Sequence, residues 1–313
     1  MLGRIMKICH LSQQLFCDVM LFFFFPSLML QYYSFDGELA FSILEELVHF
    51  GHRYYASHKR EEAMERMKSH FMCPTWETQM FQEMEPVSGK TYNLRNHICR
   101  FQSEYTTRVL LGTHYDTRMW AEESDSDIDK NTPIVGANDG SSGVAVLAAL
   151  SHLISISNLQ IGVDLVLFDG EEFGRPNVGG YCKGSQYMAL HIDDLYPNKN
   201  YPISVVVLDM IGDKELQIQP ERTSLKQHPE IYKQIWEIGK SVDASVFMAG
   251  DYGSISDDHS PFLELGIPSV LLIDFDYPYW HTQQDTLDKC SEKSLQIVGD
   301  VLWKWLNVLS MSS

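Results

Sequence analysis

The sequence predicts an α/β domain whose central sheet is mixed, mostly parallel and flanked by helices. Short apolar runs of strand length, such as residues 164–169 (DLVLFD) and 204–212 (SVVVLDMIG), alternate with segments of helical length. These runs are almost continuously apolar, as in parallel strands that helices cover on both faces. No internal repeat or linker divides residues 35–313, so we expect one domain there.

The amino-terminal third supplies helices first and strands later. Residues 35–50 carry an apolar stripe at helical spacing, formed by Leu39, Phe41, Leu44, Leu47 and Val48. A second amphipathic helix is expected over residues 59–71, whereas residues 74–95 are weakly patterned. Residues 96–101 (NHICRF) and 108–117 (RVLLGTHYDT) are predicted to form neighbouring strands, the second of them buried.

After a polar, acidic loop over residues 118–135, helices and strands alternate to the end of the chain. Helices are predicted over residues 142–154, 184–192, 228–242 and 291–309. Strands are predicted over residues 164–169, 204–212 and 268–275. Open α/β sheets place their sites beyond the carboxyl ends of such strands, which directs attention to the polar residues there.

The composition argues against nucleic acid as a partner and leaves the pairing of the cysteines open. The chain has 24 Lys and Arg against 42 Asp and Glu, and its net charge of −18 argues against nucleic-acid binding. The charge is compatible with a cationic substrate, such as a peptide with a free amino terminus, but an ordinary acidic surface is the favoured explanation. No cysteine pair has CxxC spacing, which argues against a cysteine zinc site. A disulfide between two of the last four cysteines remains open (Cys73, Cys99, Cys182, Cys290).

The first 34 residues differ from the rest of the chain. Arg4 and Lys7 precede an apolar run over residues 20–30, as in a secretory signal. The run is shorter than the ~20 residues that a spanning helix needs, and no small-x-small cleavage site follows it. We expect residues 1–34 to be a signal peptide or a membrane-tethering segment, and the protein to be exported, periplasmic or secreted. An apolar amino-terminal helix or a misplaced start is the alternative.

Five segments place metal-type ligands directly after apolar runs. They contain His114 and Asp116, Asp139, Glu171 and Glu172, Asp209, and His281. Zinc binds imidazole nitrogen and carboxylate oxygen, and a catalytic site leaves one position open. One set would be Asp139, Glu172 and His281, and a second would add His114 and Asp209 with Asp139 bridging. Asp116 lies on the same side of an extended segment as His114 and is placed to hold an imidazole.

The paired glutamates suggest a division of roles. Because two adjacent carboxylates do not easily reach one ion, Glu172 can ligate while Glu171 remains a general base and acid. Each motif alone also has a structural explanation. The glutamates could start a helix, and Asp257 or Asp258 could cap one. Their joint occurrence at strand ends predicts a metal centre.

These motifs resemble those of the zinc aminopeptidase superfamily, in particular its animal-type (type II) glutaminyl-peptide cyclotransferases and their bacterial relatives. The resemblance covers residues 35–310 and rests on HYDT, GANDGSSGVAVLAAL, LVLFDGEEFG, GSQYMA, VVLDMIG, DDHSPFLELGIP and WHTQQDT, in this order. It implies a zinc aminopeptidase-like (phosphorylase/hydrolase-like) fold. It also implies one catalytic zinc ion on Asp139, Glu172 and His281.

The resemblance further assigns roles around that ion. Glu171 would carry the proton, Asp209 would help hold the substrate amine or the tetrahedral intermediate, and Asp257 would belong to a nearby hydrogen-bond network. Trp280 would wall the substrate pocket. Tyr181 stands where relatives often have a second pocket tryptophan, which suggests a position at the pocket rim.

The implied reaction cyclises the amino-terminal glutamine of peptides or proteins to pyroglutamate and releases ammonia. One alternative is an aminopeptidase with two zinc ions, in which His114 and Asp209 are also ligands. Another is a catalytically weak relative that binds peptides. Leu271 keeps this last alternative open, because the family often has a histidine or an acidic residue at that position and a hydrogen-bond relay through it would be missing.

Overall fold

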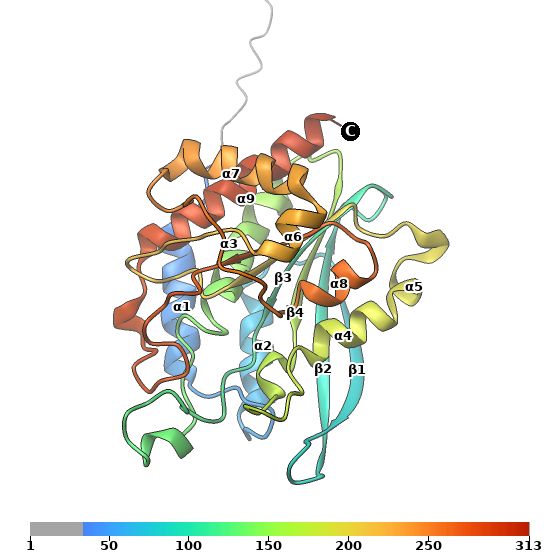
Figure 1. Cartoon of the computed structure of the whole chain (residues 1–313). Coiled ribbons are helices and arrows are strands. Elements are labelled where there is room, and N and C mark those ends of the chain that lie inside the picture. The colour runs from blue at the N-terminus through green and yellow to red at the C-terminus, as the bar shows by residue number, and fades with distance from the viewer. Residues whose placement is uncertain (1–33, 313) are drawn as a thin grey trace, which may run out of the picture. The chain divides into compact units, whose positions relative to one another are not determined.

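Six strands form the central sheet in the described part of the chain, residues 34–312 of a computed structural model (Figure 1). They are β1 (Trp76–Met84), β2 (Thr91–Phe101), β3 (Arg108–His114), β4 (Gly162–Phe168), β5 (Ser204–Asp209) and β6 (Ser269–Ile273). Their order across the sheet is β1-β2-β4-β3-β5-β6. Strands β3 to β6 are parallel, whereas β2 pairs antiparallel with β1 and β4. This arrangement confirms the predicted fold class.

The predicted pairing of residues 96–101 with residues 108–117 is wrong, because β4 lies between β2 and β3. The chain leaves β3, forms α3 (Ser142–Ile156) and returns as β4 parallel to β3, which is the crossover that parallel strands require. Every residue of β4 is buried, so this strand occupies a central place in the sheet. The β1–β2 hairpin therefore lies one position further out.

Residues 74–95, for which the sequence predicts no element, form β1 and the first part of β2. β1 is an edge strand of mixed exposure, in which Met80 and Met84 are exposed while Phe81 is buried. The Phe81 ring stacks on Tyr187 of α4 (Lys183–Leu190), with ring centroids 4.4 Å apart. A strand that is only partly covered does not need regular apolar alternation, which explains why its pattern is weak.

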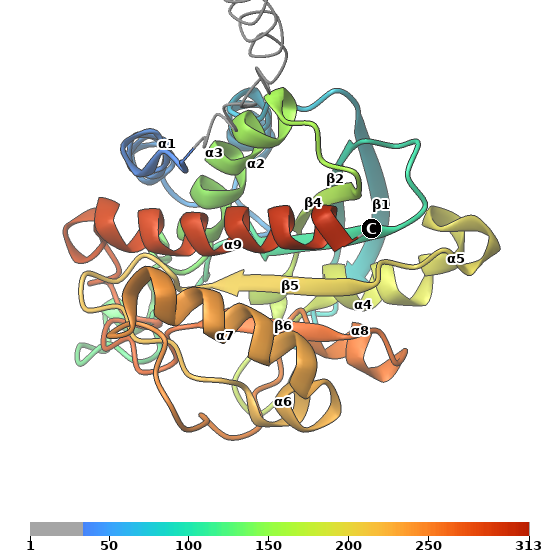
Figure 2. The same ribbon diagram turned by 90° about the horizontal axis from the view of Figure 1, so that it is seen from above.

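Helices cover both faces of the sheet (Figures 1 and 2). One face packs against α1 (Gly37–Phe50), α2 (Arg60–Ser69), α3, α7 (Pro229–Asp243) and α9 (Glu292–Ser312). The other packs against α4, α5 (Ile192–Leu195) and α8 (Ser260–Glu264). Successive β3 residues enter opposite cores, Leu111 the first and Leu110 the second, as the pleat of a strand requires.

The predicted helices are confirmed with small differences at their ends, and a short helix, α6 (Arg222–Gln227), precedes α7. At the start of α1, the Asp36 carboxylate accepts a hydrogen bond from Leu39 N (2.9 Å), which satisfies a free amide of the first turn. Within the described residues, no helix combines the length and apolar character needed to cross a bilayer. The expected signal or tethering segment lies outside the described residues, except for Ser34.

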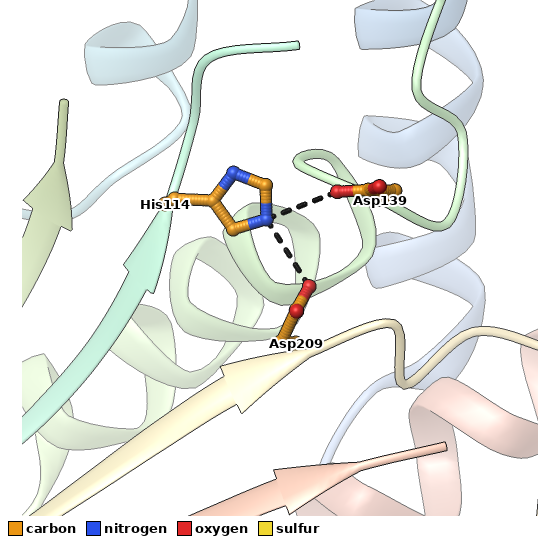
Figure 3. A group of neighbouring side chains, drawn as sticks. All are labelled: His114, Asp139 and Asp209. Atoms are coloured by element: carbon orange, nitrogen blue, oxygen red, sulfur yellow. Dashed lines mark hydrogen bonds and ion pairs between the residues drawn. The ribbon is translucent and has the colours of Figure 1, made fainter. Parts of the chain in front are cut away.

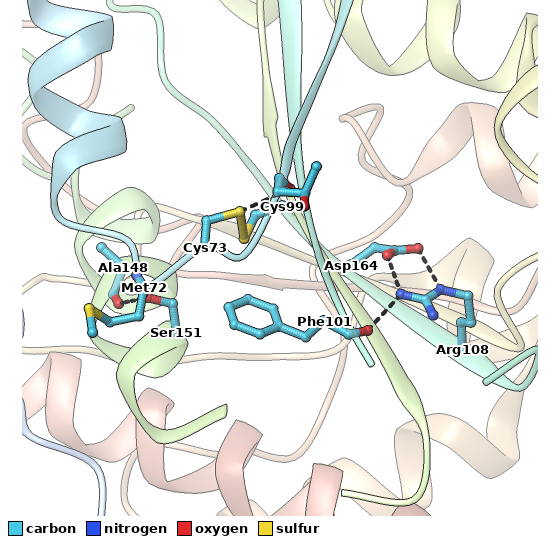
Figure 4. Close-up of a disulfide and its surroundings, with 9 residues drawn as sticks. Met72, Cys73, Cys99, Phe101, Arg108, Ala148, Ser151 and Asp164 are labelled. Carbon is cyan, nitrogen blue, oxygen red and sulfur yellow. Dashed lines mark hydrogen bonds and ion pairs between the residues drawn. A yellow bond between two sulfur atoms is a disulfide. The ribbon is translucent and has the colours of Figure 1, made fainter. Parts of the chain in front are cut away.

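A disulfide joins Cys73 and Cys99, which answers the question that the cysteine count left open (Figure 4). It ties the segment before β1 to β2 across a sequence separation of 26 residues. Beside it, the Met72 amide donates to Ser151 Oγ of α3 (2.9 Å). The disulfide therefore anchors the edge hairpin near the helical layer. Of the other described cysteines, Cys182 and Cys290 are buried and free.

Candidate metal centre

Three ligand candidates converge at the carboxyl ends of the parallel strands. His114 ends β3, Asp209 ends β5, and Asp139 lies in the loop before α3. His114 Nε2 lies 3.2 Å from Asp139 Oδ1 and 3.1 Å from Asp209 Oδ1 (Figure 3). Their ligand atoms all lie within 4.8 Å of one another, and we call these three residues the His114 group.

A second set of three residues shares Asp139. Glu172 follows β4 in a short 3-10 helix, η2 (Glu171–Phe173), and His281 lies in the loop after β6. His281 Nε2 lies 3.0 Å from Glu172 Oε1 and 3.7 Å from Asp139 Oδ2. We call Asp139, Glu172 and His281 the His281 group. Asp139 directs one oxygen to each group, which is the bridging position that the sequence suggested for it.

The loop before α3 fixes the direction of Asp139. Gly140 has a φ of +89°, and a Cβ atom there would lie 2.3 Å from the carbonyl oxygen of Asp116. The buried Asp285 carboxylate accepts hydrogen bonds from the amides of Asn138 (2.8 Å) and Asp139 (3.2 Å). Asp285 lies in the WHTQQDT motif, but the sequence did not indicate this supporting role.

Asp116 contacts members of both ligand groups. Its carboxylate accepts hydrogen bonds from the amides of Glu171 (3.2 Å) and Glu172 (3.1 Å). The sequence suggested that this side chain would hold an imidazole. In the structure, its main-chain oxygen is the closer atom, 3.2 Å from His114 Nδ1, and its carboxylate is 3.7 Å away. Asp116 thus orients His114 and the glutamate-bearing turn together.

Glu171 belongs to neither ligand group, although it precedes Glu172. Its Oε1 accepts a hydrogen bond from Cys182 Sγ at 3.3 Å, and both lie close to Asp257. Burial, and next the Glu172 charge, raise the pKa of Glu171 well above its usual range. The Asp257 side chain does not cap α8, because the helix begins after His259 and has no side-chain cap.

The acidic loop contributes two residues to the centre that the sequence motifs do not include. Glu122 Oε1 lies 3.1 Å from His281 Nδ1. The fully buried Arg118 guanidinium donates hydrogen bonds to Glu122 and to Glu172 Oε2, the latter at 2.8 Å. The available signal was that Arg118 directly follows the HYDT motif. Residues 118–135 are therefore more than a solvated acidic loop.

A cavity of about 330 Å³ opens onto the ligand groups, and Asp209, Asp257 and the predicted pocket residues Trp280 and Tyr181 line it. Trp280 stacks on the His281 ring, with centroids 3.8 Å apart. Leu271 is fully buried in an apolar core and does not line this cavity. The absence of a histidine or an acidic residue at this position therefore does not change the cavity lining. A larger cavity, of about 480 Å³, lies beside the loop after β5 and contains none of the ligand candidates.

The electrostatics of the centre suit a cation. Burial, and next the Glu172 charge, raise the pKa of Asp139 to about 8. Burial and then Asp209 raise the pKa of Asp257 to about 7. Asp139 Oδ2 is buried and lacks a hydrogen-bond partner. A divalent ion would relieve both the crowding of carboxylates and this unpaired oxygen, and the mixed imidazole and carboxylate donors are those that zinc accepts.

A comparison with known protein families identifies the family to which the chain belongs. The sequence pattern of peptidase family M28 matches residues 96–306, which contain every residue of both ligand groups. The chain belongs to peptidase family M28. The resemblance deduced from the motifs is thereby confirmed at the level of the superfamily.

Individual proteins and solved structures that are similar to this chain include cyclases and an exopeptidase. The structure is similar to that of a glutaminyl cyclase from Fimbriiglobus ruber, with a TM-score of 0.82, 28% identity, and coverage of 88% of this chain and 96% of the other. A Zn-dependent exopeptidase from Parabacteroides distasonis has a TM-score of 0.78, 26% identity, and coverage of 88% and 98%. The bovine glutaminyl-peptide cyclotransferase is 24% identical over 278 residues, 78% of this chain and 73% of its own. Some curated relatives are matched over as little as 36% of their length.

Proposed function

We propose that the protein cyclises amino-terminal glutamine of peptides or proteins to pyroglutamate and releases ammonia, with zinc as the cofactor. The observation that carries the proposal is the position of Glu171. Its carboxylate lies outside both ligand groups, yet it borders the same small cavity as the His281 group. A carboxylate in that place can move a proton between two atoms of one bound substrate. The likeness to glutaminyl cyclases supports the same reaction.

The His281 group would hold the zinc ion through Asp139, Glu172 and His281. When bound, zinc supplies Lewis-acid polarisation of the side-chain amide carbonyl of the substrate. The cavity walls carry the carboxylates of Asp209 and Asp257 together with the aromatic rings of Trp280 and Tyr181. The carboxylates suit the amino terminus, and the aromatic rings suit the apolar stem of the glutamine side chain.

The proposed proton path uses one residue. Glu171 accepts a proton from the substrate α-amine as that nitrogen forms a bond with the side-chain amide carbon. Glu171 then returns the proton to the amide nitrogen as its bond to carbon breaks, and ammonia leaves. Because the attacking amine is tethered to the carbon that it attacks, holding the chain in the cavity lowers the barrier further. The same path would convert amino-terminal glutamate more slowly, with loss of water.

One observation favours a second candidate function, an aminopeptidase with two metal ions. The His114 group is as closely assembled as the His281 group, and Asp139 bridges them. In this function Glu171 would activate water against the first peptide bond. The likeness to a Zn-dependent exopeptidase fits this alternative.

Mass spectrometry of a reacted peptide separates the two functions. The purified protein would be incubated with a short peptide that begins with glutamine, and with the same peptide acetylated at its amino terminus as a control. Loss of one ammonia from the free peptide alone would support the cyclase. Loss of the whole first residue would support the aminopeptidase and overturn our proposal.

We also propose that the protein is exported to the periplasm or secreted. Residues 1–34 would direct this export as a signal or hold the protein at the membrane as a tether. Supporting observations are the basic and apolar character of this segment and the Cys73–Cys99 disulfide. Disulfides persist mainly in oxidising compartments. Cell fractionation of the full chain, with mass determination of its amino terminus, tests this; recovery of an unprocessed protein with reduced Cys73 and Cys99 in the cytosol would contradict it.

A further inference from the structure

The two imidazoles of the centre are supported differently on the side that faces away from the ligands. His114 Nδ1 faces the main-chain oxygen of Asp116 at 3.2 Å. His281 Nδ1 instead faces a carboxylate oxygen of Glu122 at 3.1 Å. A carboxylate partner fixes the ring, keeps the proton on Nδ1 and makes Nε2 a stronger ligand. Only His281, of these two rings, has a carboxylate within hydrogen-bond distance of Nδ1.

Arg118 extends this support to the neighbouring ligand. Its Nε lies 3.0 and 3.1 Å from the two oxygens of Glu122, and its Nη1 donates to Glu172 Oε2 at 2.8 Å. The same Nη1 also donates to the carbonyl oxygen of Gly174 at 2.9 Å. With Glu172 Oε2 held in this way, Glu172 Oε1 faces His281 Nε2. The planar guanidinium thus sets which carboxylate oxygen is directed into the His281 group.

Two of the three residues in this arrangement are buried. Arg118 is fully buried and Glu172 is 2% exposed. One buried cation between two carboxylates offsets part of their mutual repulsion, and unpaired charges in such a place would be costly. No comparable arginine contacts the side chains of His114 or Asp209 among the described residues.

We propose that Arg118 and Glu122 are positioning residues that hold His281 and Glu172 in the orientation in which the His281 group binds a metal ion. The inference rests on the metal centre of the proposed function, but it holds for either reaction.

The same guanidinium also reaches the substrate side of the centre. Arg118 Nη2 donates to the hydroxyl oxygen of Tyr181 at 3.2 Å, and the guanidinium carbon lies 5.2 Å from the centre of the Tyr181 ring. Tyr181 lines the cavity. Arg118 therefore couples the position of a pocket wall to that of a metal ligand, so that its replacement should alter substrate affinity as well as metal affinity.

Zinc titration of the metal-free protein tests the proposal. Glu122→Gln keeps the size of the side chain but places an amide opposite the Arg118 donors. We expect its first zinc ion to bind about 10- to 100-fold more weakly than in the wild type, as for other partners of metal-ligating histidines. The matched control is Asp125→Asn, which removes one charge from an exposed position in the same loop. It should bind zinc as the wild type does.

The outcomes separate failure of this inference from failure of the proposed function. If the wild type and Asp125→Asn bind zinc tightly and Glu122→Gln binds it equally tightly, the positioning role is overturned. If the wild type binds no zinc, the metal centre itself is wrong. Circular dichroism of each metal-free variant establishes that it is folded.

Arg118→Lys provides a second, independent measurement. Lysine keeps the positive charge but cannot form the fork that joins Glu122 to Glu172. We expect weaker first-site zinc binding, and a raised KM at saturating zinc because Tyr181 loses its hydrogen bond. Zinc affinity and KM both equal to those of the wild type would overturn the role assigned to Arg118.

Discussion

Replacement of Glu171 by glutamine tests the proton path and leaves the metal ligands in place. Glutamine has nearly the size of glutamate but cannot accept a proton at neutral pH. Glu171 belongs to neither ligand group, and its hydrogen-bond partner is Cys182 Sγ at 3.3 Å. An amide oxygen can accept that hydrogen bond equally well. The perturbation is therefore confined to the proton that the reaction must move.

The magnitude follows from the role assigned to the residue. A positioned general acid or base contributes about 10²- to 10⁴-fold, and we expect kcat to fall by this factor. At 1.36 kcal/mol for each tenfold change, the loss of transition-state stabilisation is about 3–5 kcal/mol. Zinc content and the unfolding midpoint should stay at wild-type values, because the side chains that hold the metal are unchanged.

The assay measures kcat with a peptide that begins with glutamine, and zinc by elemental analysis of the same sample. Asp125→Asn is again the control for loss of one negative charge, here from an exposed loop position, and it should keep wild-type kcat. A Glu171→Gln protein that retains full zinc and turns over within tenfold of the wild type would refute the proton path. Loss of zinc would instead show that Glu171 supports the metal.

Three further predictions concern metal binding and stability. His281→Ala should lose both zinc and turnover, since the His281 group loses a ligand; retention of tightly bound zinc would contradict the ligand assignment. Cys99→Ser removes a bridge with a sequence separation of 26 residues, and chain entropy predicts a loss of about 3.5 kcal/mol in the free energy of unfolding. Urea unfolding under non-reducing conditions measures it, and an unchanged midpoint would exclude a stabilising bridge. Burial, and next the Lys68 charge, lower the pKa of His97 to about 3. The unfolded chain then binds a proton below pH ~6.5 that the folded protein does not, so this residue reduces stability by about 1.4 kcal/mol per pH unit from there down towards pH 3. His97→Gln should flatten that slope, and identical slopes would refute the assignment.

The elements that could be predicted from the sequence are those with complete burial or a clear apolar stripe. β4 is buried at every residue and α1 has an apolar stripe, and both patterns persist over the length of the element. β1 could not be recognised, because its exposure depends on contacts such as that of Phe81 with Tyr187 of α4. The placement of β4 between β2 and β3 could not be predicted from the sequence either, because strand order depends on how a crossover packs on the sheet.

The same division applies to the metal centre. The sequence by itself determined the family, the alternation of strands and helices, and the candidate ligands, because ligand chemistry and its position after an apolar strand are local properties of the chain. Only the tertiary structure decided that Glu122 contacts His281, that Arg118 joins Glu122 to Glu172, and that Leu271 lies away from the cavity. Those relations depend on side-chain direction across elements that are distant in sequence, and no local pattern encodes which way a folded side chain points.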